Sequence, residues 1–377
     1  MTEEFFELKG LVDEEVLDDF MESLYETLEL IEHDLSVLEL SPDNEETIHK
    51  VFRSLHTLKG NARMALLEPF SDFMHALEEA FSDVRARRTR FNLELKELFL
   101  LSLDQFRLSA ERMVQMNNIE TAPIHKLVDA LLQVNQTPPE ALPAYLKTLL
   151  QSLGGKLSEH IGASAKVVTL HSMSGRKAYA PEGKENNKDL LFFSQLSRLI
   201  DGKSPFWENR TEQILDNASL INEELEHLVA PSDLAAAVYL HDVGMMFISD
   251  YVLNKEDRLN ALEEKLIRKH PNLSYEWVVR MSGWEKAADI VLHHHERVDG
   301  KGYPKGLLGA DICLGAKIIA VADTFFSITN ERADRTYKRS LVRAIKEINA
   351  YVGAQFDEKV VDAFNEVVRQ KLVQLKE

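Results

Sequence analysis

Two residue types that bind metal ions, histidine and aspartate, recur in four short stretches of the second half of this 377-residue chain. The stretches are YLHDVGMM, KHP, HHHERVDGKGYPKG and AVADTFF, and their candidate ligands are His241, Asp242, His270, His294, His295 and Asp323. In an adjacent His-Asp pair the carboxylate can bridge two ions while the imidazole binds one. His270, His294 and His295 can complete the second ion, and Asp323 can return to the first.

A mixed set of imidazoles and carboxylates suits transition metals, so we expect two divalent ions, Fe or Mn, with Ni or Zn as alternatives. Two ions about 4 Å apart can clamp a phosphodiester and activate water for its hydrolysis. Any one of the pairs alone would be a weak signal, because single internal histidines are usually structural. His293 lies outside the ligand pattern, and we interpret it as structural.

A second kind of chemistry is indicated in the first half, within IHKVFRSLHTLKGNAR. At about 100° per residue, one stripe of this helix is apolar: Ile48, Val51, Phe52, Leu55, Leu58 and Ala62. His56 falls about a quarter-turn from the centre of the stripe, so its ring should be reachable from solvent. A neutral imidazole there can attack phosphorus, Lys59 can neutralise a transferred phosphoryl group, and Gly60 leaves room for a partner.

The elements that must position these residues are helical throughout. Apolar spacing predicts four amphipathic helices in the first 118 residues, which favours an up-down four-helix bundle. Residues 119–189 are interpreted as a helical connector, with helices near 124–134 and 142–153 and a short strand at 166–170. Helical periodicity returns in residues 190–377. The predicted fold class is therefore all-α.

Composition limits the partners and the compartment. The net charge of −18 argues against binding to polymeric nucleic acid, because phosphate repulsion would dominate. Cys313 is the single cysteine, which favours a reducing cytoplasm. The chain shows neither a signal-peptide pattern nor an apolar run of the ~20 residues that a membrane helix needs. We expect a cytoplasmic protein without membrane insertion.

The words HTLKGNA resemble the histidine phosphotransfer (HPt) domain, most closely that of the chemotaxis kinases, over about residues 8–116. The resemblance implies that His56 is the phosphorylated residue, with Lys59 and Gly60 in supporting roles. Since no kinase catalytic sequence follows, the phosphoryl group should come from a separate histidine kinase or a phosphorylated receiver domain.

The ordered set HD, HP, HHExxDGxGYP and AD resembles the HD-GYP family over about residues 190–368. The resemblance implies that the six candidate residues are metal ligands and that the substrate is cyclic di-GMP, hydrolysed to linear pGpG or GMP. It also implies a signature loop near substrate, or near a GGDEF-domain partner, made of Asp299, Gly300, Gly302, Tyr303 and Pro304. Arg332 would meet a phosphate or a guanine.

Two departures from the HD-GYP pattern leave the activity open. The family usually has HDIGK, and Met245 stands where that lysine would contact phosphate. The family also has an upstream histidine ligand, and the matching region here, PFWENRTEQIL, has none; Glu208 could offer an oxygen instead. One interpretation is a slow phosphodiesterase regulated by phosphorylation of His56. The alternative is a degenerate HD-GYP domain that binds cyclic di-GMP or docks a protein within a phosphorelay. A housekeeping HD nucleotidase is disfavoured by the intact DGKGYP.

Overall fold

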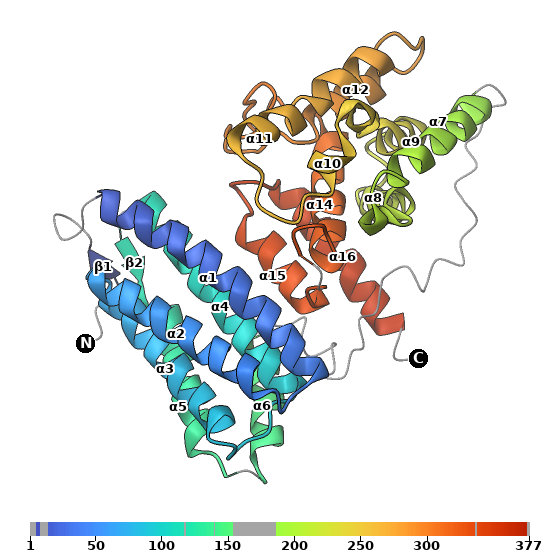
Figure 1. The fold of residues 1–377 in the computed structure, drawn as a ribbon. Helices are drawn as coiled ribbons and strands as arrows, with labels where there is room; N and C mark the ends of the chain where they lie inside the picture. Colours follow the sequence, from blue (N-terminus) through green and yellow to red (C-terminus); the bar gives the residue numbers. More distant parts are fainter. Residues whose placement is uncertain are drawn as a thin grey trace. The chain divides into compact units, whose positions relative to one another are not determined.

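The computed structural model describes residues 5–7, 14–116, 118–138, 140–153, 186–335 and 338–374. The chain divides into two compact units, Met1–Ser164 and Ala165–Glu377. Both units are built from α-helices, which confirms the all-α prediction (Figure 1). The strand suggested at residues 166–170 lies outside the described residues.

The described residues of the first unit form six helices. They are α1 (Glu14–Leu40), α2 (Glu45–Met64), α3 (Glu68–Arg85), α4 (Leu93–Met116), α5 (Thr121–Gln136) and α6 (Leu142–Leu153). Helix α2 packs against both α1 and α3, and α4 packs against α1. A short antiparallel pair, β1 (Phe5–Glu7) with β2 (Asn118–Glu120), joins the start of the chain to the end of α4.

Helices α5 and α6, which fall within the region interpreted as a connector, share the core of the first unit. Leu127 and Leu131 of α5 and Leu146 of α6 are buried in the same apolar cluster as the first four helices. Helix α5 packs along α3, and α6 packs against α4. The bundle is therefore larger than the four helices predicted.

The start of α2 is specified locally, and its packing fixes which face carries His56. Asn44 caps the helix by accepting a hydrogen bond from the Thr47 amide at 3.1 Å. Glu45 and Glu46 follow in the first turn, where negative charge favours the helix. Val51, Leu55 and Leu58 are fully buried. Burial of this stripe leaves the adjoining face of α2 open to solvent.

The described residues of the second unit form eight longer helices and four short helical segments. Its long helices are α7 (Asn186–Asp201), α8 (Arg210–Glu224), α9 (Pro231–Leu240), α12 (His270–Val278), α13 (Glu285–His293), α14 (Leu314–Thr329), α15 (Leu341–Ala350) and α16 (Glu358–Gln374). Short helical segments are η3 (Pro205–Trp207), η4 (Val243–Phe247), α10 (Asp250–Leu253) and α11 (Ala261–Ile267). Helix α9 contacts α7, α8 and α13, and α14 contacts α8, α13 and α15. In α9, Ala235, Ala236 and Ala237 are buried, and their small side chains permit this close packing.

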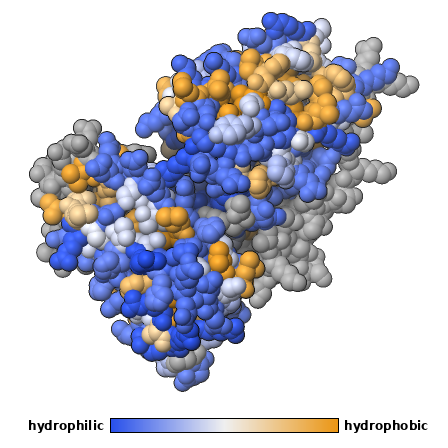
Figure 2. All heavy atoms as spheres, in the orientation of Figure 1, coloured by the Kyte–Doolittle hydropathy of each residue, from blue (hydrophilic) through white to orange (hydrophobic). Residues whose placement is uncertain are grey.

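Apolar side chains also gather on the outside of the second unit, over the region of α11 and α12 (Figure 2). Phe247 of η4 and Trp277 of α12 are both exposed, yet their rings lie 5.8 Å apart. This contact ties η4 to α12 from the solvent side. Within the described segments, no helix is long and apolar enough to cross a membrane.

Candidate metal centre and phosphoacceptor site

The candidate ligands of the second unit come from four helices and converge in its interior. His241 and Asp242 directly follow α9, and His270 begins α12. His294 and His295 follow α13, and Asp323 lies within α14. Four of the six candidate ligands are buried: His241, Asp242, His270 and His294. Side chains far apart in the sequence thus meet in one place.

Three of the imidazoles are oriented in the same way by the backbone. The Nδ1 atoms of His241, His270 and His294 lie 2.6–2.7 Å from the carbonyl oxygens of residues three positions earlier. A carbonyl oxygen can only accept, so each Nδ1 carries the proton and donates it. In the neutral ring, Nε2 then presents a lone pair to the interior. A hydrogen bond from the non-ligating nitrogen is what orients metal-bound histidines.

Three acceptor atoms, Nε2 of His270, Nε2 of His294 and Oδ1 of Asp242, lie close together without a hydrogen atom between them. His270 Nε2 lies 3.2 Å from His294 Nε2 and 3.1 Å from Asp242 Oδ1. Asp242 Oδ1 is buried and accepts no hydrogen bond from the described part of the chain. The ligand atoms of His270, His294 and His295 all lie within 4.8 Å of one another. This arrangement fits one divalent ion, held by the three histidines and Asp242.

The charge states of the rings agree with that assignment. Burial, reinforced by the neighbouring imidazoles, lowers the pKa of His294 well below its ordinary value. Burial likewise lowers the pKa of His295 to about 3. Both rings are therefore neutral at pH 7, the form that binds metal. His293, the first histidine of the run, lies outside this group, and burial lowers its pKa too.

The other half of the centre is filled by Arg210, the first residue of α8. Its Nη1 lies 2.6 Å from Asp242 Oδ2, and its Nη2 donates to Asp323 Oδ1 at 2.8 Å. The same Nη2 lies 3.3 Å from His241 Nε2, the lone pair left by the Nδ1 hydrogen bond. One guanidinium thus engages all three groups assigned by sequence to the first ion.

The opposite charges of Arg210 and of Asp242 and Asp323 stabilise one another in the buried cluster. Burial alone would lower the pKa of Arg210, but the carboxylates of Asp242 and Asp323 raise it above its ordinary value. Burial would raise the pKa of Asp242, but the positive charge of Arg210 holds it well below the usual range. Arginine has no lone pair to offer a metal. His241, Asp242 and Asp323, as arranged here, do not fit a second ion.

The signature loop contacts the centre through Tyr303. Tyr303 stacks on His295, with ring centroids 4.8 Å apart. Buried Glu296 accepts hydrogen bonds from the amides of Lys305 and Leu307 at 2.7 and 2.9 Å. A Cβ on Gly302 would lie 2.3 Å from the Arg297 amide nitrogen, so only glycine fits. The loop therefore buttresses a candidate ligand.

The remaining loop residues and Arg332 lie apart from the imidazole group. Asp299 pairs with Arg297 at 2.8 Å and accepts the Lys301 amide. Gly300 has φ +77°, which favours glycine, and Pro304 follows Tyr303 through a cis peptide bond. Arg332 is exposed and donates to Asp334 and to Ser327, which lies one turn beyond Asp323 on α14. Arg332 is thus paired with an aspartate at the surface.

Met245 differs from its expected setting. The HDIGK pattern predicts that a lysine at this position contacts substrate phosphate. Instead, the chain turns into η4 after Asp242, and Met245 is buried in an apolar cluster with Val243, Ile248 and Val252. A lysine at 245 would meet apolar side chains, which argues against a contact between this position and substrate phosphate.

In the first unit, His56 forms a triad with Glu78 and Lys59. The His56 side chain is 65% exposed, and its Nδ1 lies 2.8 Å from Glu78 Oε1 on α3. Lys59 bonds the other oxygen of Glu78. Burial alone raises the pKa of Glu78, but the hydrogen bonds from Lys59 and His56 lower it below its ordinary value. The carboxylate holds Nδ1, which leaves Nε2 with a lone pair on the exposed side.

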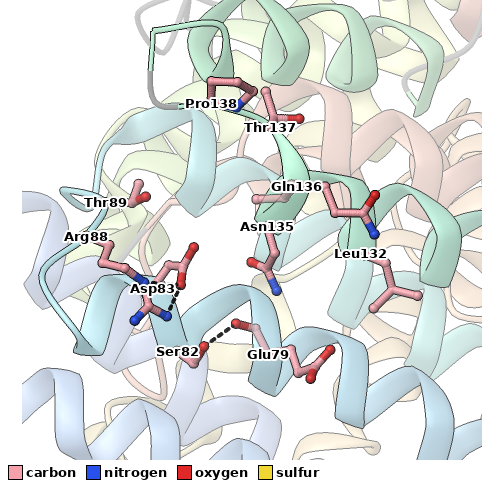
Figure 3. A pocket seen from close by; sticks show the side chains of 11 residues that line it. Glu79, Ser82, Asp83, Arg88, Thr89, Leu132, Asn135, Gln136, Thr137 and Pro138 are labelled. Carbon is pink, nitrogen blue, oxygen red and sulfur yellow. Dashed lines mark hydrogen bonds and ion pairs between the residues drawn. The ribbon is translucent and has the colours of Figure 1, made fainter.

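The surroundings of this triad are open. A Cβ on Gly60 would meet nothing within 4 Å, so packing within the chain does not require glycine there. A separate hollow of about 600 Å³ lies between the C-terminal ends of α3 and α5 and is lined by polar residues such as Ser82, Asp83 and Asn135 (Figure 3). His56 does not line it.

The two sites define two classes of domain, and comparison with known proteins agrees. The family model described as the Hpt domain matches residues 15–113, and the one described as the HD domain matches residues 194–360. The chain therefore combines an N-terminal Hpt domain with a C-terminal HD domain of the HD-GYP kind, as its motifs predicted.

Three relatives illustrate the match. The chain is 35% identical over 192 residues to the cyclic di-GMP phosphodiesterase response regulator RpfG of Xanthomonas campestris, covering 48% of each. It is 30% identical over 141 residues to the 3'3'-cGAMP-specific phosphodiesterase 3 of Vibrio cholerae, covering 37% of this chain and 30% of that protein. It is 36% identical over 98 residues to the chemotaxis protein CheA of Borreliella burgdorferi, covering 26% and 11%. The chain thus spans about half or less of these relatives.

Sequence reasoning missed two residues at these sites. Arg210 directly follows Asn209, in the stretch where the HD-GYP pattern has a histidine, and nothing in its spacing marks it as buried. Glu78 carried a detectable signal, because it follows Met74 by four residues and precedes Phe81 by three, which puts a carboxylate on the apolar face of its helix.

Proposed function

We propose that this chain is a phosphorelay protein in which His56 accepts a phosphoryl group in trans and controls a metal-dependent phosphodiesterase acting on cyclic di-GMP. The observation that carries the enzymatic part is the set of unshared electron pairs on His270, His294 and Asp242, which has the composition of a transition-metal site. An ion bound there, Fe or Mn by the chemistry of its ligands, would supply a Lewis acid for a phosphoryl oxygen.

The chain's own residues would do the remaining work. The backbone carbonyls hold the imidazoles with their lone pairs inward, and Tyr303 stacked on His295 shields one ligand from water. The exposed Lys301 and Lys305 of the signature loop offer positive charge at the surface, where we propose that a GGDEF-domain partner docks.

The test of the enzymatic part uses the full chain with Mn²⁺ or Fe²⁺. Cyclic di-GMP and 3'3'-cGAMP are each incubated with the protein, and linear dinucleotide and mononucleotide are separated by chromatography. Hydrolysis of cyclic di-GMP that disappears in the double variant His294→Ala, His295→Ala supports the proposal. No product from either dinucleotide would overturn it.

A second candidate function is a binding module without turnover, and the position of Arg210 favours it. The guanidinium neutralises the carboxylates that would otherwise hold an ion. Calorimetric titration with cyclic di-GMP separates the two: tight binding without product identifies a receptor, and product formation identifies the enzyme.

The phosphoacceptor part rests on the exposed Nε2 of His56. Phosphoramidate, a small phosphoryl donor, serves as the probe because the cognate kinase is not needed. Acid-labile phosphate should appear on the wild type and be absent from His56→Gln, with His49→Gln as the matched control on the same helix. Equal labelling of His56→Gln would contradict the assignment. A change in cyclic di-GMP hydrolysis after labelling, absent in His56→Gln, would demonstrate the control.

A further inference from the structure

The centre contains a cation supplied by the chain itself. His241 Nε2 and Asp242 Oδ2 come from the segment that follows α9, and Asp323 Oδ1 comes from α14, yet each of the three atoms lies within 3.3 Å of a terminal nitrogen of Arg210. These are one imidazole lone pair and two carboxylate oxygens, a donor set that would suit a divalent ion. Here they surround a guanidinium.

We propose that Arg210 takes the place of one metal ion, so that this HD domain binds a single divalent ion, at His270, His294, His295 and Asp242, and not a pair. The inference concerns metal content and holds whichever dinucleotide the domain recognises.

Arg210 is fixed in this position by its local structure. It is 8% exposed, and its guanidinium lies 5.2 Å from the Trp207 ring centroid. Asn209, just before it, has φ +54°, and this left-handed turn starts α8 at Arg210. Asp201 accepts hydrogen bonds from the amide and hydroxyl of Thr211, which anchors the same turn. The side chain is therefore held between an aromatic ring and two carboxylates.

A second ion could enter only if this guanidinium left. Arginine keeps its charge at every accessible pH, so it repels a divalent ion and offers it no ligand. Displacing the guanidinium would separate this buried positive group from its two carboxylate partners, which is strongly unfavourable. The ion at the three histidines meets a different setting, because Asp242 uses one oxygen for Arg210 and leaves Oδ1 free of hydrogen bonds from the described residues.

The experiment counts ions in the full-length wild type and in Arg210→His, which exchanges the guanidinium for an imidazole ligand. Each protein is loaded with Mn²⁺ and desalted, and bound manganese is measured by elemental analysis. Electron paramagnetic resonance then distinguishes isolated Mn²⁺ from an exchange-coupled pair. Arg280→His, at an exposed position of the same unit, is the matched control.

We expect one manganese per wild-type chain with the signal of an isolated ion, and the same result for Arg280→His. Arg210→His should approach two ions and show a coupled pair. Two ions or none in the wild type would overturn the inference, and so would one ion in a folded Arg210→His. If Arg210→His fails to fold, the wild-type count still decides. Failure of the dinucleotide assay leaves this count unaffected, so the two proposals can fail separately.

Discussion

Glu78 is the residue on which the chemistry of His56 depends most directly, since its carboxylate fixes the ring and is itself held by Lys59. We predict that Glu78→Gln slows phosphorylation of His56 by phosphoramidate by about 10- to 100-fold, because a hydrogen bond to a charged group contributes ~1.5–3 kcal/mol. The rate is measured by loss of free His56 in timed mass spectra. Glu79→Gln, one residue along α3, should label at the wild-type rate; equal slowing of both would show a general effect on the helix.

The lowered pKa of Glu78 also makes a prediction about pH. A carboxyl group whose pKa is lower in the folded than in the unfolded state contributes stability above the unfolded pKa, and loses it as the pH falls through the folded pKa. The wild type should therefore be more stable than Glu78→Gln at pH 6, with the difference shrinking below about pH 4.5, the ordinary region for Glu. Urea unfolding of the two proteins at a series of pH values measures the difference. A difference that grows in acid would contradict the proposed ion pair.

At the scale of the elements, sequence periodicity predicted the apolar face of a helix but not the neighbour against which that face packs. The apolar stripe of α2 was visible in sequence, and its Val51, Leu55 and Leu58 are buried as predicted. The attachment of α5 and α6 to the bundle was not visible, because their apolar faces do not say which neighbour they cover. The position of Arg210 was hidden for a similar reason: it depends on a left-handed turn and on carboxylates more than 30 residues away.

The segment after the His-Asp pair provides the element-scale test. Since Met245 lies in an apolar cluster and Met246 is 43% exposed, adjacent lysine substitutions should differ sharply. Met245→Lys should lower the stability of the second unit by roughly 2–4 kcal/mol through burial of a charge, with no gain in dinucleotide hydrolysis. Met246→Lys should change stability by less than about 0.5 kcal/mol. Thermal unfolding decides; a stable Met245→Lys with faster turnover would restore the role expected from HDIGK.

At the scale of the whole molecule, the chain carries two helical units, each with its own buried side chains and its own chemistry. All candidate metal ligands lie in the second unit, and His56, Lys59 and Glu78 lie in the first. Any control of one site by the other is a coupling free energy between them, which requires that phosphorylation change the stability or the ligand affinity of the second unit. The stability of each unit can be followed separately if each responds to a different perturbation.

We therefore predict that calorimetry of the full chain resolves two transitions. Mn²⁺ binds only folded ligands in the second unit, so at about 100 times its dissociation constant it should stabilise that unit alone by ~2.7 kcal/mol. Leu55→Ala removes a fully buried side chain from the first unit and should lower the other transition by ~2–5 kcal/mol. His294→Ala with His295→Ala should abolish the response to Mn²⁺ and leave the Leu55-sensitive transition in place.

With the transitions so assigned, labelling His56 with phosphoramidate reports coupling directly: a shift in the Mn²⁺-sensitive transition, absent in His56→Gln, means that the phosphoryl group acts on the metal-binding unit. A single transition moved by both Mn²⁺ and Leu55→Ala would instead mean that the two units unfold as one.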